Sequence, residues 1–172
     1  MSIQRLTPVL AAILLAACQP EQPPAEPVSA PSEAPAIAGA PAGDFQTPED
    51  LIRALYAEET IPVEPATIRR FFTEEFVTPL TPTEDGAVVD FDYRIDGQDG
   101  AAENLQVEEI AGGPTGGVVV TRFTNMGQAM QNTWTVCRQP DGRLRIVEAT
   151  TQGPPAWSLR QLAGLPARAE GC

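Results

Sequence analysis

The sequence predicts an α+β domain behind an N-terminal membrane anchor, and three observations lead to this fold class. Apolar residues recur at helical spacing between residues 47 and 76, whereas residues 105–151 alternate and are rich in β-branched side chains. Glycine and proline turns separate the β segments. Segregation of helices and strands along a chain is typical of α+β folds. We expect N-terminal helices packed on a curved antiparallel sheet of about four strands.

Residues 1–17 have the features of a secretory signal. Arg5 precedes an apolar run over residues 6–17, which is too short to span a bilayer core of about 30 Å. The run ends in LAAC, which resembles a bacterial lipobox, and this resemblance implies a lipid on the sulfur of Cys18. An ordinary signal peptide with an unmodified Cys18 is the alternative. Because Gln19 replaces the aspartate of an inner-membrane retention signal, we expect an outer-membrane anchor that faces the periplasm.

The next segment, residues 18–45, is predicted to be a disordered tether. Residues 19–44 contain seven prolines and three glutamates but no aromatic residue. Such a composition cannot form an apolar core, and proline favours an extended backbone. The tether therefore spaces a folded domain, residues 46–172, from the lipid surface. A proline motif for a partner protein is the alternative, although no aromatic or basic anchor accompanies the prolines.

Two helices are expected at the start of the folded domain. The TPED sequence at 47–50 supplies a cap, a proline and two acids where a helix begins, and apolar residues follow at helical spacing to Tyr56. Pro62 ends this element. A second helix begins at Glu64-Pro65, and its apolar face is assigned to the core. That face consists of Ile68, Phe71, Phe72 and Phe76.

Four strands follow the acidic connection in the prediction. Their ranges are 105–110, 118–125, 129–138 and 144–151. The Pro-Asp-Gly sequence at 140–142 predicts a hairpin turn, and Ser158 is expected to cap a short final helix. In the last strand, strict alternation places Leu144, Ile146 and Glu148 on one face.

Composition excludes several kinds of chemistry. The chain has no histidine, and all 11 of its basic residues are arginines. A Ser-His-Asp triad, a lysine Schiff base and a histidine-ligated metal are therefore ruled out. The net charge of −12 disfavours nucleic acid as a partner, because phosphate contacts need clustered cations. We expect no cofactor and no metal site, and we assign no catalytic residue.

The cysteines predict one disulfide. If Cys18 carries a lipid, Cys137 and Cys172 remain, and an exported chain meets an oxidising compartment. We therefore expect a Cys137–Cys172 bond that joins the C-terminus to the domain. Two unpaired thiols are the alternative.

The stretch VVDFDYRIDGQDG, residues 88–100, carries four aspartates around Arg94. An EF-hand loop starting at Asp90 would place Arg94 and Ile95 where an oxygen ligand and a glycine are required, so this template fails. Asp-Gly pairs form turns, and Arg94 neutralises part of the charge. We expect a structural connection between helices and sheet, with another kind of cation site as the alternative.

The order of elements resembles the cone-shaped fold of nuclear-transport-factor-two-like, or cystatin-like, proteins. More narrowly, the chain resembles an uncharacterised family of bacterial exported proteins, often lipoproteins. The resemblance rests on the helix around residues 54–56, the acidic connection over residues 90–99, and a strand pair followed by a short helix. It covers residues 47–165, and it implies that Asp92, Gln98 and Asp99 clamp the backbone of the acidic connection rather than act in catalysis. Family members often have proline where this chain has Tyr93.

The resemblance also implies a cone interior, whose candidate lining is Tyr56, Asn132, Trp134 and Glu148. Some enzymes of this fold are isomerases or cyclases that use a buried carboxylate as a base. No second carboxylate is fixed near Glu148 by spacing, so we favour a lipid-anchored, non-enzymatic domain that binds a protein or a small ligand. A pocket-carboxylate enzyme is one alternative. An acidic inhibitor or immunity-type protein that binds a basic exported enzyme is the other.

Overall fold

The structure of this protein is a computed structural model that describes residues 45–169 and 171–172. The predicted signal, the lipidation site Cys18 and the tether up to residue 44 lie outside the described residues. Within the described part, no helix has the length and apolar character needed to cross a membrane.

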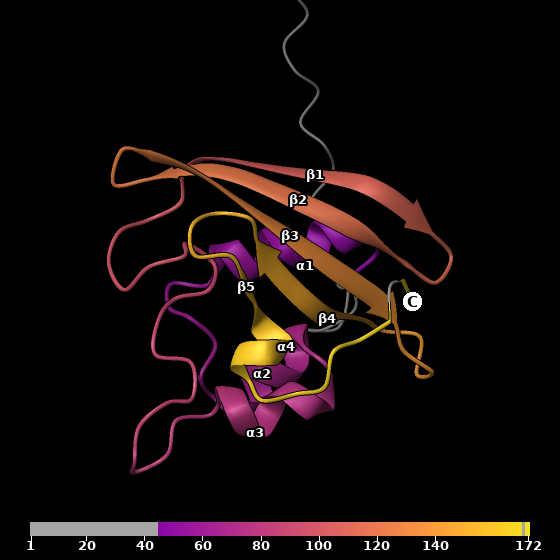
Figure 1. Cartoon of the computed structure of the whole chain (residues 1–172). Coiled ribbons are helices and arrows are strands. Elements are labelled where there is room, and N and C mark those ends of the chain that lie inside the picture. The colour runs from indigo at the N-terminus through magenta and orange to yellow at the C-terminus, as the bar shows by residue number, and fades with distance from the viewer. Residues whose placement is uncertain (1–44, 170) are drawn as a thin grey trace, which may run out of the picture. The chain divides into compact units, whose positions relative to one another are not determined.

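A five-stranded antiparallel sheet forms one layer of the domain, with the strands in sequence order from β1 to β5 (Figure 1). The α+β prediction is confirmed at this level. Four long strands match the expected ones, and β5 adds a short pairing with β4 that was not predicted. The strands are β1 (Glu103–Gly113), β2 (Gly116–Asn125), β3 (Gln128–Arg138), β4 (Leu144–Thr151) and β5 (Trp157–Ser158).

Helix α1 (Pro48–Ala57) begins as predicted and lies beneath the sheet (Figure 1). The Thr47 hydroxyl accepts a hydrogen bond from the Asp50 amide at 3.1 Å, and the Asp50 carboxylate accepts one from the Thr47 amide at 3.2 Å. This reciprocal capping box satisfies two backbone donors that would otherwise lack partners. The apolar face of α1, including Leu51 and Leu55, is buried in the core that also contains Trp134.

The predicted second helix, from residue 64 to residue 76, is broken into three short pieces. They are α2 (Pro65–Phe71), a 3₁₀ turn η1 (Glu74–Phe76) and α3 (Val77–Leu80). The break occurs because Phe72 is extended and pairs with Ile146 of β4, whose carbonyl accepts from the Thr73 amide at 3.2 Å. This pairing covers an edge of β4 that helix packing alone would leave open. The predicted apolar face is nevertheless buried throughout.

A bulge in β4 corrects the predicted position of Glu148. Thr135 of β3 pairs with Glu148, but the next residue of β3, Val136, pairs with Ile146, so Val147 is the extra residue. The extra residue reverses the alternation beyond it. Consequently Leu144, Ile146 and Ala149 enter the core, whereas Glu148 does not share their face.

The C-terminal region closes the domain against β3 and β4. Ser158 caps α4 (Leu159–Leu162) as predicted, since its hydroxyl accepts from the Gln161 amide at 3.3 Å. The expected disulfide between Cys137 and Cys172 is present, with Cα atoms 5.5 Å apart. This bond fastens the last residue of the chain to β3.

Candidate functional site

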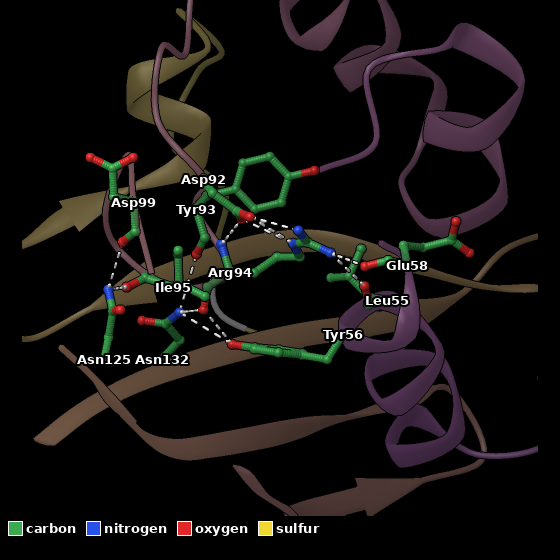
Figure 2. A network of polar contacts seen from close by, with 10 residues as sticks. All are labelled: Leu55, Tyr56, Glu58, Asp92, Tyr93, Arg94, Ile95, Asp99, Asn125 and Asn132. Carbon is green, nitrogen blue, oxygen red and sulfur yellow. Dashed lines mark hydrogen bonds and ion pairs between the residues drawn. The ribbon is translucent and has the colours of Figure 1, made fainter. Parts of the chain in front are cut away.

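The site is organised around Arg94, which lies in the irregular segment between α3 and β1, residues 81–102, called here the crossover segment. Its side chain is only 9 % exposed, and Figure 2 shows that it reaches from the crossover toward the end of α1. Arg94 Nη2 donates to Asp92 Oδ2 at 2.6 Å, and Nε donates to Oδ1 at 2.9 Å. Nη1 donates to the carbonyls of Leu55 at 3.3 Å and Glu58 at 2.8 Å. One buried arginine thus neutralises Asp92 and satisfies the C-terminal end of α1.

A chain of side-chain hydrogen bonds ties the same segment to the sheet. Trp134 Nε1 donates to the Thr121 hydroxyl at 3.0 Å, and that oxygen lies 3.0 Å from the Tyr56 hydroxyl. Tyr56 donates its single proton to the Arg94 carbonyl at 2.7 Å, so Thr121 must be the donor to Tyr56. Each hydroxyl therefore both donates and accepts, which strengthens the chain and fixes the position of the Arg94 backbone.

Asn132 of β3 reinforces this attachment from within the core. Its Nδ2 donates to the carbonyls of Tyr93 at 3.1 Å and Arg94 at 2.9 Å (Figure 2). Asn125, at the end of β2, binds further along the crossover segment and donates to the Ile95 carbonyl at 3.0 Å. Both asparagines are buried, so two neighbouring strands hold the crossover backbone through direct side-chain hydrogen bonds.

The two tyrosines of the chain, Tyr56 and Tyr93, both have raised pKa values. Burial raises the pKa of the Tyr56 hydroxyl far above its ordinary value, although its hydrogen bonds to Thr121 and Asn132 oppose the shift. Burial also raises the pKa of Tyr93, and the negative charge of Asp92 adds to the effect. Both phenols are therefore neutral at physiological pH, and neither acts as a base.

A cavity of about 640 Å³ lies between the crossover segment and the loop that follows α1. We call it the crossover cavity. Its apolar wall includes the side chains of Ile61, Val63, Leu80, Val89 and Phe91. The same Arg94 and Asp92 that organise the network line it on the polar side, so the hydrogen bonds described above hold part of the wall. A smaller hollow of about 170 Å³ lies next to it and is lined by Tyr56.

Tyr93 lies within the wall of the crossover cavity and carries a buried hydroxyl. Its ring is fully buried and packs edge-on against Phe72, with the ring centroids 5.6 Å apart. The hydroxyl is buried and has no hydrogen-bond partner within the described residues. Figure 2 shows that it points away from the Arg94 network. A buried hydroxyl of a lining residue that lacks a partner is unfavourable unless something else supplies one.

The structure brings together three of the four predicted cone residues. Tyr56 packs edge-on against Trp134 at 5.9 Å, and Asn132 Nδ2 lies 3.4 Å from the Tyr56 hydroxyl. They form packed core rather than the wall of the crossover cavity. Glu148 lies elsewhere, because the β4 bulge turns it toward α4. There it accepts from the Ser158 hydroxyl at 2.8 Å and from the amides of Ala149 and Arg160 at 2.9 and 3.3 Å.

The three predicted clamps of the acidic stretch behave differently. Asp92 accepts from the Arg94 amide at 2.9 Å in addition to the guanidinium, and its own amide donates to Gly97. Asp99 contributes only its backbone carbonyl, which lies 3.5 Å from Asn125 Nδ2. Gln98 is exposed, lines the crossover cavity and makes no side-chain hydrogen bond within the described residues. Asp96, not singled out as a clamp from the sequence, accepts from Trp157 Nε1 at 2.5 Å.

In the described residues, no three carboxylate or cysteine side chains converge on a place that could hold a metal ion. No family model, no curated protein and no solved structure matches the chain.

Proposed function

We propose that the chain is a lipid-anchored envelope protein whose folded domain binds a small, partly apolar ligand in the crossover cavity. The lipobox-like sequence that ends at Cys18 supports the anchor, and Gln19 supports the outer membrane. The disulfide between Cys137 and Cys172 suits an oxidising compartment outside the cytoplasm. We further propose that the domain is a member of the cone-shaped folds, since α1 lies beneath the antiparallel sheet as that fold requires.

The observation that carries the binding proposal is the size of the crossover cavity together with its apolar wall. A volume of about 640 Å³ falls within the usual range for small-molecule sites, roughly 300–1,000 Å³. The apolar wall favours a hydrocarbon or aromatic body.

The charged residues around the crossover cavity limit the net charge that a ligand can carry. Glu59 and Asp90 are exposed at its wall, and Arg94 is already occupied by Asp92. A negatively charged ligand would meet unpaired carboxylates and no available cation there. The ligand is therefore neutral or positively charged.

The residues that line the crossover cavity support ligand binding rather than catalysis. Asp92 is held by a guanidinium, and the raised pKa of Tyr93 keeps its phenol neutral. No histidine exists in the chain to act as an acid or base. Glu148, the carboxylate on which an isomerase-like reaction would depend, instead accepts hydrogen bonds beside α4.

The neutral fluorescent compound N-phenyl-1-naphthylamine provides a direct test. The full-length chain carrying Cys18→Ser, which removes the predicted lipid, is titrated with the probe. We expect saturable binding that Ala87→Trp weakens by about tenfold or more, because Ala87 is exposed and lines the cavity, where a large ring occupies ligand space. Ala167→Trp, an exposed position in the C-terminal segment, is the matched control and leaves binding unchanged. Equal binding by both tryptophan variants would refute the site.

A further inference from the structure

A second cavity, of about 510 Å³, lies where the β2–β3 hairpin meets the loop that follows β4, and we call it the hairpin cavity. Figure 1 shows both segments at the same end of the sheet, beside the crossover segment, which contributes Asp96 to the lining. The hairpin cavity and the crossover cavity share no lining residue. The two cavities are therefore separate sites.

Part of the lining of the hairpin cavity is apolar. Phe123 of β2 and Met130 of β3 are cross-strand partners, so their side chains share one face of the sheet. Phe123 also packs against Tyr56, with the ring centroids 6.0 Å apart, which places this face on the core side. Pro154, in the loop after β4, adds a third apolar lining residue. These side chains can accept the hydrocarbon part of a ligand.

Asp96 places one carboxylate at the wall of the hairpin cavity. The indole nitrogen of Trp157 donates to its Oδ1 at 2.5 Å, which fixes the orientation of the carboxylate. The other oxygen, Oδ2, accepts no hydrogen bond from any described residue and reaches solvent. A Cβ atom at Gly153, which also lines the cavity, would lie 3.8 Å from Oδ2. Because glycine has no side chain, space for a small polar group remains beside this oxygen.

The charges of the hairpin cavity favour a cation. Among the described residues that line it, Asp96 and Arg122 are the charged ones. The Arg122 guanidinium is 2.8 Å from the carboxylate of Glu108 on β1, so its charge is already balanced. Within the same described part of the chain, the Asp96 carboxylate contacts the neutral indole alone. The net charge of −12 of the whole chain adds to the attraction for a cation.

We propose that the hairpin cavity binds a primary ammonium group on a short apolar chain, either a free alkylamine or the side chain of a lysine in a partner protein. The ammonium group donates to Asp96 Oδ2, and the apolar chain packs against Phe123 and Met130. The aromatic ring of Phe123 is also a favourable neighbour for a cation. A metal ion is a poorer fit, because no three carboxylate or cysteine side chains converge in the described residues. This site is independent of the proposed function.

Nuclear magnetic resonance of the Trp157 indole tests the site at the residue that orients Asp96. The isotope-labelled full-length chain carrying Cys18→Ser is titrated with hexylamine, and with hexanol as the uncharged analogue. We expect hexylamine to shift the Trp157 N–H signal saturably and hexanol to bind about tenfold or more weakly. The chain has two tryptophans, and Trp134, whose N–H donates to Thr121 in the core, is the internal reference. Trp157→Phe assigns the two signals.

Two asparagine variants separate the carboxylate of the site from the charge of the surface. Asp96→Asn removes the charge but keeps an acceptor for Trp157, and asparagine tolerates the left-handed backbone at this position, where φ is 53°. Asp99→Asn, at an exposed position outside the lining, is the matched control. We expect Asp96→Asn to weaken hexylamine binding by about tenfold or more and Asp99→Asn by less than about twofold. Far-UV circular dichroism verifies that both variants are folded.

Two further arms identify the cavity and the source of the amine. Ala87→Trp, which occupies the crossover cavity, is expected to leave hexylamine binding unchanged, so a failure here is distinct from a failure of the proposed function. An acetylated and amidated peptide with one central lysine replaces hexylamine in the second arm. Binding of the peptide assigns the ligand to a lysine side chain, and binding of hexylamine alone assigns it to a free amine. The proposal is overturned if neither amine moves the Trp157 signal, if hexanol binds as well as hexylamine, or if both asparagine variants lose binding equally.

Discussion

Replacing Arg94 by methionine is expected to destabilise the domain by about 3–5 kcal/mol. Methionine keeps an unbranched apolar stem but removes every donor. The Asp92 carboxylate, only 17 % exposed, then loses its guanidinium, and the carbonyls of Leu55 and Glu58 lose their donors. Each lost hydrogen bond to a buried carbonyl costs about 1 kcal/mol, and the unpaired carboxylate accounts for the rest.

Urea unfolding of the full-length chain measures this effect. Arg122→Met is the matched control, since Arg122 is paired with Glu108 at 2.8 Å but is 46 % exposed, and its loss is expected to cost below about 1 kcal/mol. Adding Asp92→Asn to the Arg94 variant removes the uncompensated charge and is expected to recover about 1 kcal/mol or more. If Arg94→Met costs no more than the control, or if Asp92→Asn restores nothing, the network does not hold the crossover segment as described.

Three further predictions concern the rest of the domain. Reduction of the disulfide, whose cysteines are 35 residues apart, is expected to lower the free energy of unfolding by about 4 kcal/mol on the loop-entropy model, and denaturation with and without reductant measures this. Because burial raises the pKa of both tyrosines, their stabilising effect is complete below pH 10.0, the ordinary value, and is lost as the pH rises above it. Tyrosinate absorbance should therefore appear together with the loss of circular dichroism, and absorbance that rises while the fold persists would contradict the burial. The Arg160 guanidinium lowers the pKa of Glu75 below 4.5, so their interaction stabilises the fold above that pH and is lost as the pH falls through the lowered value. Acid unfolding of Glu75→Gln should accordingly depend less on pH than that of the natural chain.

Local signals predicted the beginnings and ends of elements well. The TPED sequence at 47–50 forms the predicted cap, Ser158 begins α4, and the hairpin turn at 140–142 joins β3 to β4. These features depend on residues within a few positions of one another. The apolar face of the predicted second helix is likewise buried, even though the helix is not continuous. Local chemistry therefore indicated which side chains are buried more reliably than it indicated the path of the backbone.

The errors arise where distant segments meet. Phe72 leaves the helix because Ile146 offers an edge for pairing, and the bulge at Val147 moves Glu148 out of the predicted interior. Neither effect has a signal in the local pattern. Arg94 was recognised as neutralising its aspartate neighbours, but its bonds to Leu55 and Glu58 depend on how α1 packs.

Native mass spectrometry of the protein purified from the cells that produce it tests whether the crossover cavity holds a small ligand. The natural chain is compared with Ala87→Trp, which occupies the cavity, and with Ala167→Trp, which does not. The account predicts a small neutral or cationic molecule bound to the natural chain and to Ala167→Trp, released on unfolding and absent from Ala87→Trp. The same bound mass in all three proteins, or in none of them, would contradict it.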